Sequence, residues 1–385
     1  MDLAGWPIVV ETYRLDGVYF TSVSSADAGA RFARAQGVSR DEAERAAVEK
    51  AERWLNKTRK SGPHMRTRSH PRTGWPISEI GYGMWGVGGW TGADDEETRA
   101  SLDEAVSLGC NFFDTAWAYG AGHSEQLLGQ LVQRHPDTRL FVATKIPPKN
   151  LRWIHLDGFT LDEVFPADHI REYTEKSLEN LGVGAIDLQQ FHAWSDRWGH
   201  DDRWQRAVDD LKREGLVRSF GISVNRWEPT NVVKALASGL VDSVQVVYNI
   251  FDQNPEDELF PYCQEHGIAI IARVPFDEGS LTGTLTRDSA WPEGDWRNLY
   301  FTPPQLAEAL EHVERLKPVV PVGMTLPELA LRFILHHPAV TTVIPGMRRL
   351  SNVRANLAAS DGRPLAAPVV DSLRAHRWER DWVVP

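Results

Sequence analysis

Four residues at or just beyond the ends of short apolar runs have the side-chain types that protonation of a carbonyl oxygen requires. They are Asp114, Tyr119, Lys145 and His192. An unperturbed phenol has a pKa of about 10 and is a poor acid at neutral pH. A nearby ammonium lowers that pKa, and an imidazole can orient the phenol or the substrate oxygen. The aspartate can hold the lysine in place and limit the cost of its burial, so we expect one proton-transfer site.

The pattern around these residues predicts the fold that would bring them together. Short apolar runs occur at 77–81, 111–114, 140–144, 186–191, 219–222, 243–247, 268–271 and 341–344. Helix-like segments separate most of them, at 96–108, 124–134, 168–181, 203–214, 228–238, 255–266, 303–315 and 326–336. Eight predicted strands that alternate with helices over about 300 residues are typical of an α/β fold of the (β/α)8 TIM-barrel type. In that fold the catalytic residues lie at the C-terminal ends of the strands. An open doubly wound sheet is the main alternative, but no Gly-x-Gly-x-x-Gly follows an early strand.

Each of the four residues has an ordinary structural explanation when it is taken alone. A strand-end aspartate often caps a helix, and a single buried histidine or lysine is more often structural than catalytic. A tyrosine at a position such as 119 is usually a loop aromatic. Their order on successive strands is what favours a shared site.

The first 60 residues have a different pattern from the rest of the chain. Residues 7–13 and 18–23 predict two strands joined at a Leu-Asp-Gly turn, and Ser39 followed by Glu42 predicts a helix start. We therefore expect a small ββα module over 1–60, a linker over 61–74 and the barrel over 75–385. Nine Lys or Arg against two Glu between Arg45 and Arg72 indicate either a patch for a nucleic acid or an acidic partner, or a solvated helix end with its linker, and we favour the second.

Composition narrows the class of protein further. The net charge of −11 argues against a general nucleic-acid binder, and no apolar run approaches the length of a membrane helix. The start lacks a secretory signature, and Cys110 and Cys263 lie in apolar segments, as expected for free thiols in a reducing compartment. We expect a cytoplasmic protein with a small-molecule substrate and neither a nucleic-acid nor a membrane partner. The oligomeric state is left open.

Residues 75–360 carry a series of motifs in a fixed order. They are Phe-Asp-Thr-Ala…Tyr-Gly…Ser-Glu from Phe113, Ala-Thr-Lys at Lys145, Asp-Leu…His ending at His192, Gly-Ile-Ser…Asn from Gly221, Gln245, and Ile-Pro-Gly…Asn from Ile344. With these motifs the segment resembles the aldo-keto reductase superfamily of NAD(P)H-dependent (β/α)8 barrels. The resemblance implies that Tyr119 is the general acid of carbonyl reduction. It also implies that Lys145 and His192 assist Tyr119, and that Asp114 pairs with Lys145.

The same resemblance implies how the cofactor binds. Ser223, Asn225 and Gln245 would hold the nicotinamide carboxamide, although Val224 separates the usual adjacent Ser-Asn pair. The loop after the seventh strand would embrace the pyrophosphate through Pro275, Gly279 and Ser280, and Arg273 stands where many relatives place an aromatic. The last strand leads to Gly346, Arg348, Arg349, Asn352 and Asn356. An arginine pair near a helix start suits a 2′-phosphate, so we expect NADP(H) to be preferred over NAD(H); the alternative is two solvated surface arginines.

Tryptophans concentrate just after the predicted strand ends. We expect Trp85, Trp117 and Trp194 to line the substrate site, with Trp153, Trp198 and Trp227 on the same face. An aromatic-walled cleft favours aromatic aldehydes, ketones or stacked sugar rings. We expect no metal, since the adjacent pair His336 and His337 is better explained as a helix end before Pro338. The alternative function is a cofactor-binding sensor or scaffold with slow turnover, but such a protein has no chemical need for all four polar groups.

Overall fold

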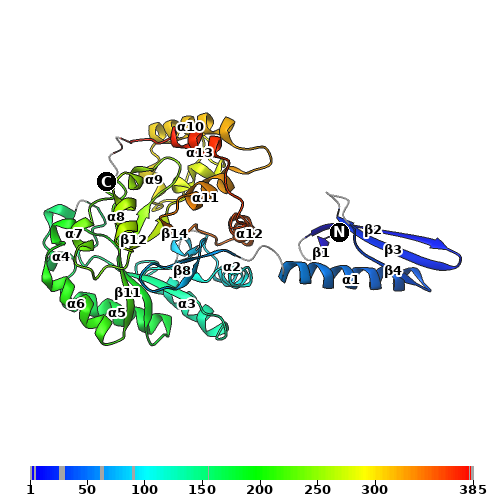
Figure 1. Ribbon diagram of the computed structural model, residues 1–385, viewed down its shortest axis with the longest axis horizontal. Coiled ribbons are helices and arrows are strands. Elements are labelled where there is room, and N and C mark those ends of the chain that lie inside the picture. Colours follow the sequence, from blue (N-terminus) through cyan, green and yellow to red (C-terminus); the bar gives the residue numbers. More distant parts are fainter. Residues whose placement is uncertain are drawn as a thin grey trace. The chain divides into compact units, whose positions relative to one another are not determined.

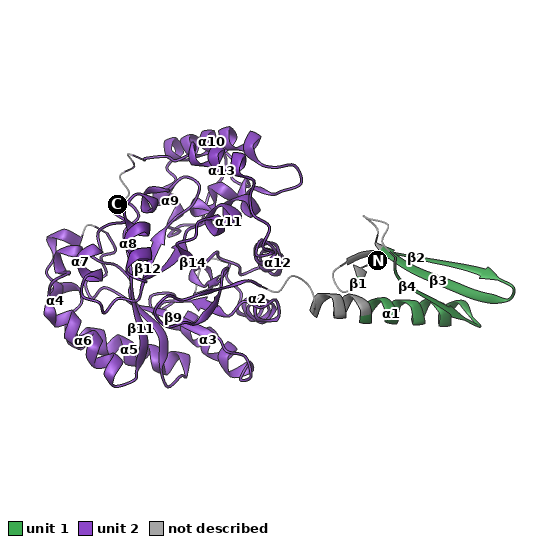
Figure 2. Ribbon diagram, in the orientation of Figure 1, with its two compact units in different colours: residues 1–64 green, residues 65–385 purple. Residues whose placement is uncertain are grey.

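The computed structural model describes residues 2–3, 6–25, 31–60, 65–88, 92–154, 156–380 and 382 (Figure 1). The chain divides into two compact units, Met1–His64 and Met65–Pro385 (Figure 2).

The first unit is a four-stranded antiparallel sheet with one helix. Its elements are β1 (Asp2–Leu3), β2 (Trp6–Leu15), β3 (Val18–Ser25), β4 (Arg31–Gly37) and α1 (Arg40–Lys60). A small core of Ile8, Val23, Ala33, Ala47 and Ala51 joins the sheet to the helix. The predicted ββα module lacked β4. The inward residues of β4 include alanines, which favour strands weakly. The alternation of apolar and polar residues that predicts a strand is therefore weak in this segment.

The second unit is built on an eight-stranded parallel sheet. In order along the chain, its strands are β7 (Tyr82–Gly83), β8 (Phe112–Asp114), β9 (Phe141–Ile146), β10 (Ile186–Phe191), β11 (Val217–Ser223), β12 (Ser243–Val247), β13 (Ala269–Arg273) and β14 (Val340–Val343). Parallel bridges between Ile80 and Val343 and between Gly83 and Gly346 join the chain at and just before β7 to the chain at and just after β14. The sheet therefore closes into a barrel.

Helices surround this barrel (Figure 1). They are α2 (Asp95–Ser107), α3 (His123–Arg134), α4 (Leu161–Val164), α5 (Ala167–Leu181), α6 (Asp202–Arg213), α7 (Val233–Leu236), α8 (Leu259–Glu265), α9 (Arg297–Tyr300), α10 (Pro303–Leu316), α11 (Leu326–His336), α12 (Leu350–Ala358) and α13 (Ala367–Arg374). The expected helix over 228–238 is shorter than predicted, because only the four residues of α7 are α-helical.

The structure corrects the predicted first strand. The run at 77–81 is divided: β6 (Pro76–Ser78) pairs antiparallel with β5 (Thr67–Ser69), and the first barrel strand begins only at Tyr82. The hairpin partner lies in the segment that we expected to be a linker. Arg68 donates hydrogen bonds of 3.1 and 2.6 Å to the carbonyls of His337 and Val340, so residues 65–74 are part of the barrel unit.

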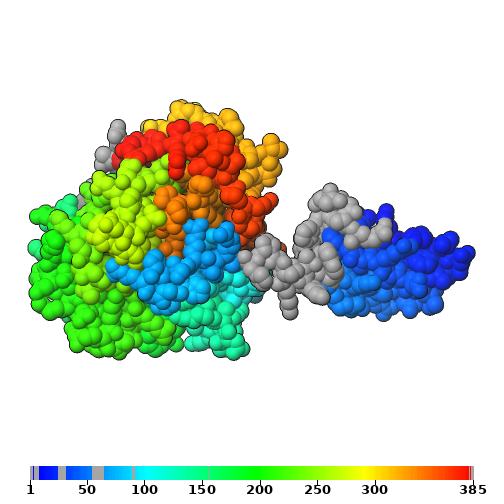
Figure 3. All heavy atoms as spheres, in the orientation of Figure 1, coloured from blue at the N-terminus to red at the C-terminus, as the bar shows by residue number. Residues whose placement is uncertain are grey.

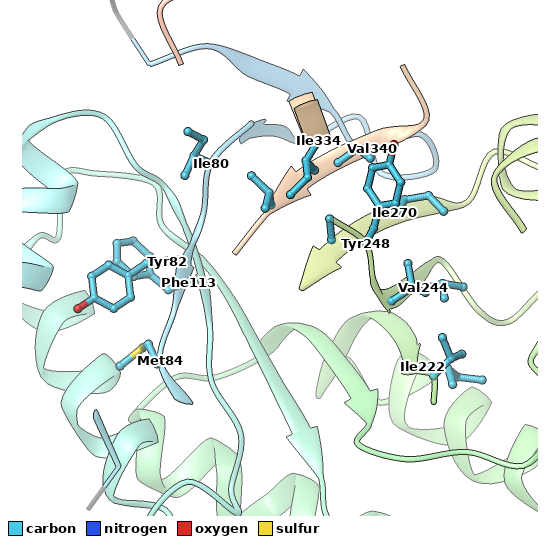
Figure 4. Packing of buried hydrophobic residues seen from close by; sticks show 14 of the residues in the cluster. Ile80, Tyr82, Met84, Phe113, Ile222, Val244, Tyr248, Ile270, Ile334 and Val340 are labelled. Carbon is cyan, nitrogen blue, oxygen red and sulfur yellow. The ribbon is translucent and has the colours of Figure 1, made fainter. Parts of the chain in front are cut away.

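The core of the barrel unit has two layers. The larger layer lies between strands and helices, and Figure 4 shows Ile222, Val244, Ile270 and Val340 as part of it. The smaller layer fills the barrel interior and consists of Ile77, Phe112, Phe141, Ala143, Leu188, Ile271 and Ile344, with Trp75 packed against it. Trp75 stacks on Phe141 with ring centroids 5.3 Å apart. The β5–β6 hairpin and Trp75 therefore support the apolar layer of the barrel interior from below.

Candidate active site

Strand periodicity places the polar residues directly above the apolar layer of the barrel interior. Successive side chains of a strand alternate between its two faces, so residues two positions apart share a face. Phe112 precedes Asp114 by two, and Ala143 precedes Lys145 by two. The same spacing relates Leu188 to Gln190 and Ile271 to Arg273. The interior is therefore apolar at its floor and charged at the C-terminal ends of its strands.

Asp114 and Lys145 form a buried ion pair between neighbouring strands. Lys145 Nζ lies 2.5 Å from Asp114 Oδ1, and the two side chains are 1% and 3% exposed. The ammonium also donates a 2.8 Å hydrogen bond to the carbonyl of Thr115. Because a buried charge is tolerated only when it is paired and hydrogen-bonded, the aspartate keeps the ammonium in the barrel.

Two glutamine side chains complete the environment of Asp114. Gln190 and Gln245 both donate to Asp114 Oδ2, from Nε2 atoms at 3.1 and 2.8 Å. Gln190 was not among the predicted site residues, although its place two residues before His192 on β10 could have indicated it. Gln245 was expected to hold a nicotinamide carboxamide, and its amide nitrogen here contacts the aspartate.

Tyr119 lies on the loop between β8 and α3, with its ring near Lys145 and His192. Lys145 Nζ is 5.2 Å from the centre of the phenol ring, and the ring of His192 lies edge-on at 5.5 Å. Burial raises the pKa of Tyr119, and the positive charge of Lys145 opposes this rise. The loop needs a close neighbour without a side chain, since a Cβ on Gly88 would lie 2.5 Å from the backbone of Tyr119.

His192 follows β10 and contacts two aromatic rings. It meets Tyr119 on one side, and Trp153 at a ring distance of 4.7 Å. Burial lowers the pKa of His192 well below its usual value, and the charges of Lys145 and Arg273 lower it further. The imidazole is therefore neutral at pH 7. Its Nδ1 is buried and has no hydrogen-bond partner in the described part of the chain.

The residues expected to hold the nicotinamide lie on the neighbouring strand ends. Ser223 is buried at the end of β11, and Asn225 accepts a 3.2 Å hydrogen bond from the backbone of Trp227. Arg273 donates a 3.0 Å hydrogen bond to the carbonyl of Val224. The guanidinium thus ties the end of β13 to the β11 loop, and its buried Nε has no partner among the described residues.

The loop after β13 has an unusual backbone. Val274, Asp277 and Glu278 have φ angles of 56°, 45° and 53°, a region that non-glycine residues rarely adopt. Gly279 follows at 113°. Ser280 donates a 2.6 Å hydrogen bond to Asp277, so its hydroxyl is used within the loop. Pro275 is buried at the start of the loop.

The residues expected near a 2′-phosphate surround the start of α12. Gly346 bridges to Gly83, and Arg349 directly precedes the helix. Arg348 is half-buried, whereas Arg349 and Asn352 are exposed. Asn356 is buried one turn further along.

The structure separates the three tryptophans expected in the substrate pocket. Trp85 is exposed, and Trp117 lies edge-on to Tyr173 with ring centroids 4.7 Å apart. Trp194 is only 3% exposed and stacks on Phe191, which places it in the core. Among the described tryptophans, Trp153 is the one whose ring contacts His192, and this residue is 41% exposed. All of these tryptophans follow predicted strand ends. The sequence position alone therefore could not show which of them line the pocket and which pack in the core.

Two negative findings concern the described residues alone. Within them, no group of three or more His, Cys, Asp or Glu side chains is arranged to hold a metal ion. No helix in the described ranges is long and apolar enough to cross a membrane.

Comparison with known proteins identifies the family. Residues 79–377 match the model of the Aldo/keto reductase family. The chain is 30% identical over 315 residues to the uncharacterized oxidoreductase YqkF of Bacillus subtilis, covering 81% of this chain and 96% of that protein. It is 29% identical over 308 residues to the NADH-specific methylglyoxal reductase of Escherichia coli, covering 74% and 90%. The solved structure of aldo-keto reductase AKR11C1 from Bacillus halodurans, holo form, matches with a TM-score of 0.64 at 28% identity, covering 82% and 97%.

The chain therefore belongs to the aldo-keto reductase family. It is an NAD(P)H-dependent oxidoreductase built on a (β/α)8 barrel. The predicted family, fold class and class of enzyme are confirmed.

Proposed function

We propose that the protein reduces an aldehyde or ketone to an alcohol, with Tyr119 as the general acid and NADPH as the preferred reductant. The observation that carries the proposal is the proximity of the Tyr119 ring to both the buried ammonium of Lys145, at 5.2 Å, and the neutral imidazole of His192, at 5.5 Å. A reduced nicotinamide supplies the hydride in such a reaction. The protein must deliver the proton.

Each polar group has a distinct part in that proton delivery. Tyr119 donates its phenolic proton to the carbonyl oxygen as negative charge develops there. Lys145 stabilises the resulting phenolate, and Asp114 keeps Lys145 in place. His192, which is neutral, can orient the carbonyl oxygen by a hydrogen bond without competing as an acid.

Unused polar atoms support binding of a cofactor and substrate at this end of the barrel. Buried polar atoms nearly always have hydrogen-bond partners in folded proteins. His192 Nδ1 and Arg273 Nε are buried without one in the described part of the chain. The nest-like backbone of the loop from Val274 to Gly279 is also of a kind that receives anions such as a pyrophosphate.

Tyr119→Phe tests the acid. We expect NADPH oxidation with 4-nitrobenzaldehyde to fall by roughly 10²–10⁴-fold, the usual contribution of a general acid. Tyr262→Phe is the matched control. Tyr262 lies on α8, away from the strand ends, and its ring stacks on His266, which follows that helix. Equal rates for wild type and Tyr119→Phe would refute the mechanism. Tight NADPH binding by both proteins without turnover would favour the sensor alternative.

The cofactor preference needs its own test, since the Escherichia coli relative is named as NADH-specific. Arg348 and Arg349 support NADPH by their charge and their place before α12. Replacing both with alanine should weaken NADPH binding far more than NADH binding, as measured by cofactor fluorescence titration. An equal loss for the two cofactors would exclude a 2′-phosphate role.

A further inference from the structure

The segment after α13 packs against α10 and the chain at Phe251. The backbone N–H of Trp378 donates a 2.9 Å hydrogen bond to the carbonyl of Phe251. The Trp378 ring stacks on His312 of α10 at 3.8 Å, and Trp382 donates a 2.9 Å hydrogen bond to Glu308. Figure 3 shows the red C-terminal residues beside the orange residues of α10.

This packed segment carries a fully buried arginine. The side chain of Arg380 is 0% exposed, and its guanidinium lies 4.3 Å above the centre of the Trp378 ring. Arg380 Nη1 donates a 2.8 Å hydrogen bond to Oδ1 of Asp277, whose side chain is equally inaccessible. A C-terminal residue therefore contacts the loop after β13 directly.

Arg380 is one member of a cluster that we call the loop cluster, made of Arg226, Asp252, Asp277, Tyr300 and Arg380. Arg226 lies 3.4 Å from Asp277 and 3.7 Å from Asp252, and Arg380 lies 3.6 Å from Asp252. The hydroxyl of Tyr300 donates to Asp277 at 2.9 Å and accepts from both guanidinium groups. Two cations balance two anions, and each member comes from a different segment of the chain.

Two of these segments carry the predicted cofactor residues. Arg226 directly follows Asn225, on the loop expected to hold the nicotinamide. Asp277 lies within the loop expected to embrace the pyrophosphate, where its second carboxylate oxygen accepts the hydrogen bond from Ser280. Positive φ angles at Asp277 and Glu278 persist only where surrounding contacts hold the backbone. The loop cluster provides those contacts.

We propose that Arg380 is a positioning residue that holds these two loops together and thereby sets how slowly the nicotinamide cofactor leaves. The inference rests on the proposed function, because it takes the two loops to be the cofactor loops. Without Arg380, Asp277 keeps Arg226 and Tyr300 as its partners outside its own loop among the described residues, and the C-terminal segment no longer restrains the β13 loop. The loop then opens more often, and the cofactor dissociates faster.

The test is the rate of cofactor release. NADPH is bound to the full-length protein, excess NADP⁺ is added, and the loss of NADPH fluorescence is followed by stopped flow. We expect Arg380→Met to release NADPH faster by roughly tenfold, because substitutions near a binding site act mainly on the dissociation rate. The KM for NADPH should rise while kcat does not fall, and Arg380→Lys should restore part of the slow release.

Arg377→Met is the matched control. Arg377 lies on the same segment, but its partners are Asp257 and Glu379 on the surface, at 2.7 and 2.9 Å. Its release rate should equal that of wild type. A release rate for Arg380→Met equal to that of Arg377→Met would overturn the proposal, as would a lower melting temperature with unchanged release, which indicates a purely structural role.

A second variant covers the case in which Arg380→Met does not fold. Tyr300→Phe keeps the ring and removes the hydroxyl that links Asp277 to both guanidinium groups. It should accelerate release in the same direction by a smaller factor, and unchanged release in this variant would overturn the proposal. A wild-type protein that binds no nicotinamide cofactor would instead refute the proposed function, so the two failures are distinguishable.

Discussion

Two of the buried ionic groups in the described part of the barrel unit differ in what holds their charges in place. The pair of Asp114 and Lys145 sits on the adjacent strands β8 and β9, whose register is fixed by backbone hydrogen bonds. The loop cluster draws its two arginines and two aspartates from loops and from the C-terminal segment. In the first group the backbone positions the charges. In the second the charges position the backbone.

This difference points to two different roles, proton transfer for the barrel pair and positioning of the loops for the loop cluster. A buried ion pair costs several kcal/mol of desolvation per ion and is weak evidence for stability. Lys145 is better explained by its position 5.2 Å from the Tyr119 ring than by any gain in stability. No member of the loop cluster is among the four residues predicted to protonate the carbonyl oxygen. It acts on the loops that carry it.

The largest effect should follow from breaking the barrel pair. Lys145→Met leaves Asp114 buried without its counter-ion, so we expect unfolding to become easier by about 3–5 kcal/mol. The reductase rate should fall by about 10²–10⁴-fold, because the phenol loses its supporting charge. Adding Asp114→Leu should recover stability but not activity, as measured by urea unfolding and NADPH oxidation.

The control for this prediction is Lys317→Met. Lys317 forms an ion pair with Glu314, and both side chains are exposed. Exposed pairs contribute about 0–1 kcal/mol, so stability and rate should hardly change. Recovery of activity in the double variant at 114 and 145 would show that charge at the barrel centre is not required.

A smaller loss of stability is expected from the loop cluster. Arg380→Met leaves Asp277 with Arg226 and Tyr300 still in contact, so we expect a loss of about 1–3 kcal/mol, typical of a buried polar group that loses a hydrogen-bond partner. Urea unfolding measures it beside Lys145→Met. A loss as large as that of Lys145→Met would mean that the remaining members do not compensate, and the contrast between the two groups would fail.

Acid should weaken both regions through histidines whose folded pKa is lowered. Burial lowers the pKa of His192 in the barrel, and it lowers the pKa of His312, under the C-terminal segment, to about 4. Below the ordinary histidine pKa of about 6.5, the unfolded chain therefore binds protons that the folded protein does not. Stability should be independent of these groups above that pH and fall as pH decreases from it.

Urea unfolding at a series of pH values between 7 and 4 measures this slope. His312→Phe should make it shallower, whereas His200→Phe, at an exposed position, should leave it unchanged. An identical slope for His312→Phe and wild type would show that His312 takes up its proton equally in both states.

The smallest effect concerns the aromatic wall. Trp153→Leu should raise the KM for 4-nitrobenzaldehyde by roughly 2–10-fold, because an aromatic contact contributes about 0.5–1.5 kcal/mol. Trp194→Leu should lower the melting temperature and leave that KM unchanged, since this ring packs on Phe191 in the core. The reverse pattern would restore Trp194 to the substrate site.

Much of the barrel could be predicted because strand patterns are local. Buried parallel strands read as short apolar runs, and β10 and β12 have the bounds that the sequence indicates. The errors have local causes too. Residues 76–78 carry the same apolar signal as a barrel strand, and only their pairing with 67–69 shows that they belong to a hairpin. Strand β4 was not predicted, because the alanines on its inward face give only a weak apolar signal.

The sequence by itself determined the order of Asp114, Tyr119, Lys145 and His192 along the chain and the two-residue spacing that directs Asp114 and Lys145 into the barrel. The roles of these four residues stay predictions. Only the tertiary structure decided that Gln190 and Gln245 share Asp114, that Trp153 rather than Trp194 contacts His192, and that Arg380 reaches Asp277. The physical reason is range: periodicity acts over neighbouring residues, whereas these contacts depend on where distant segments of the chain meet.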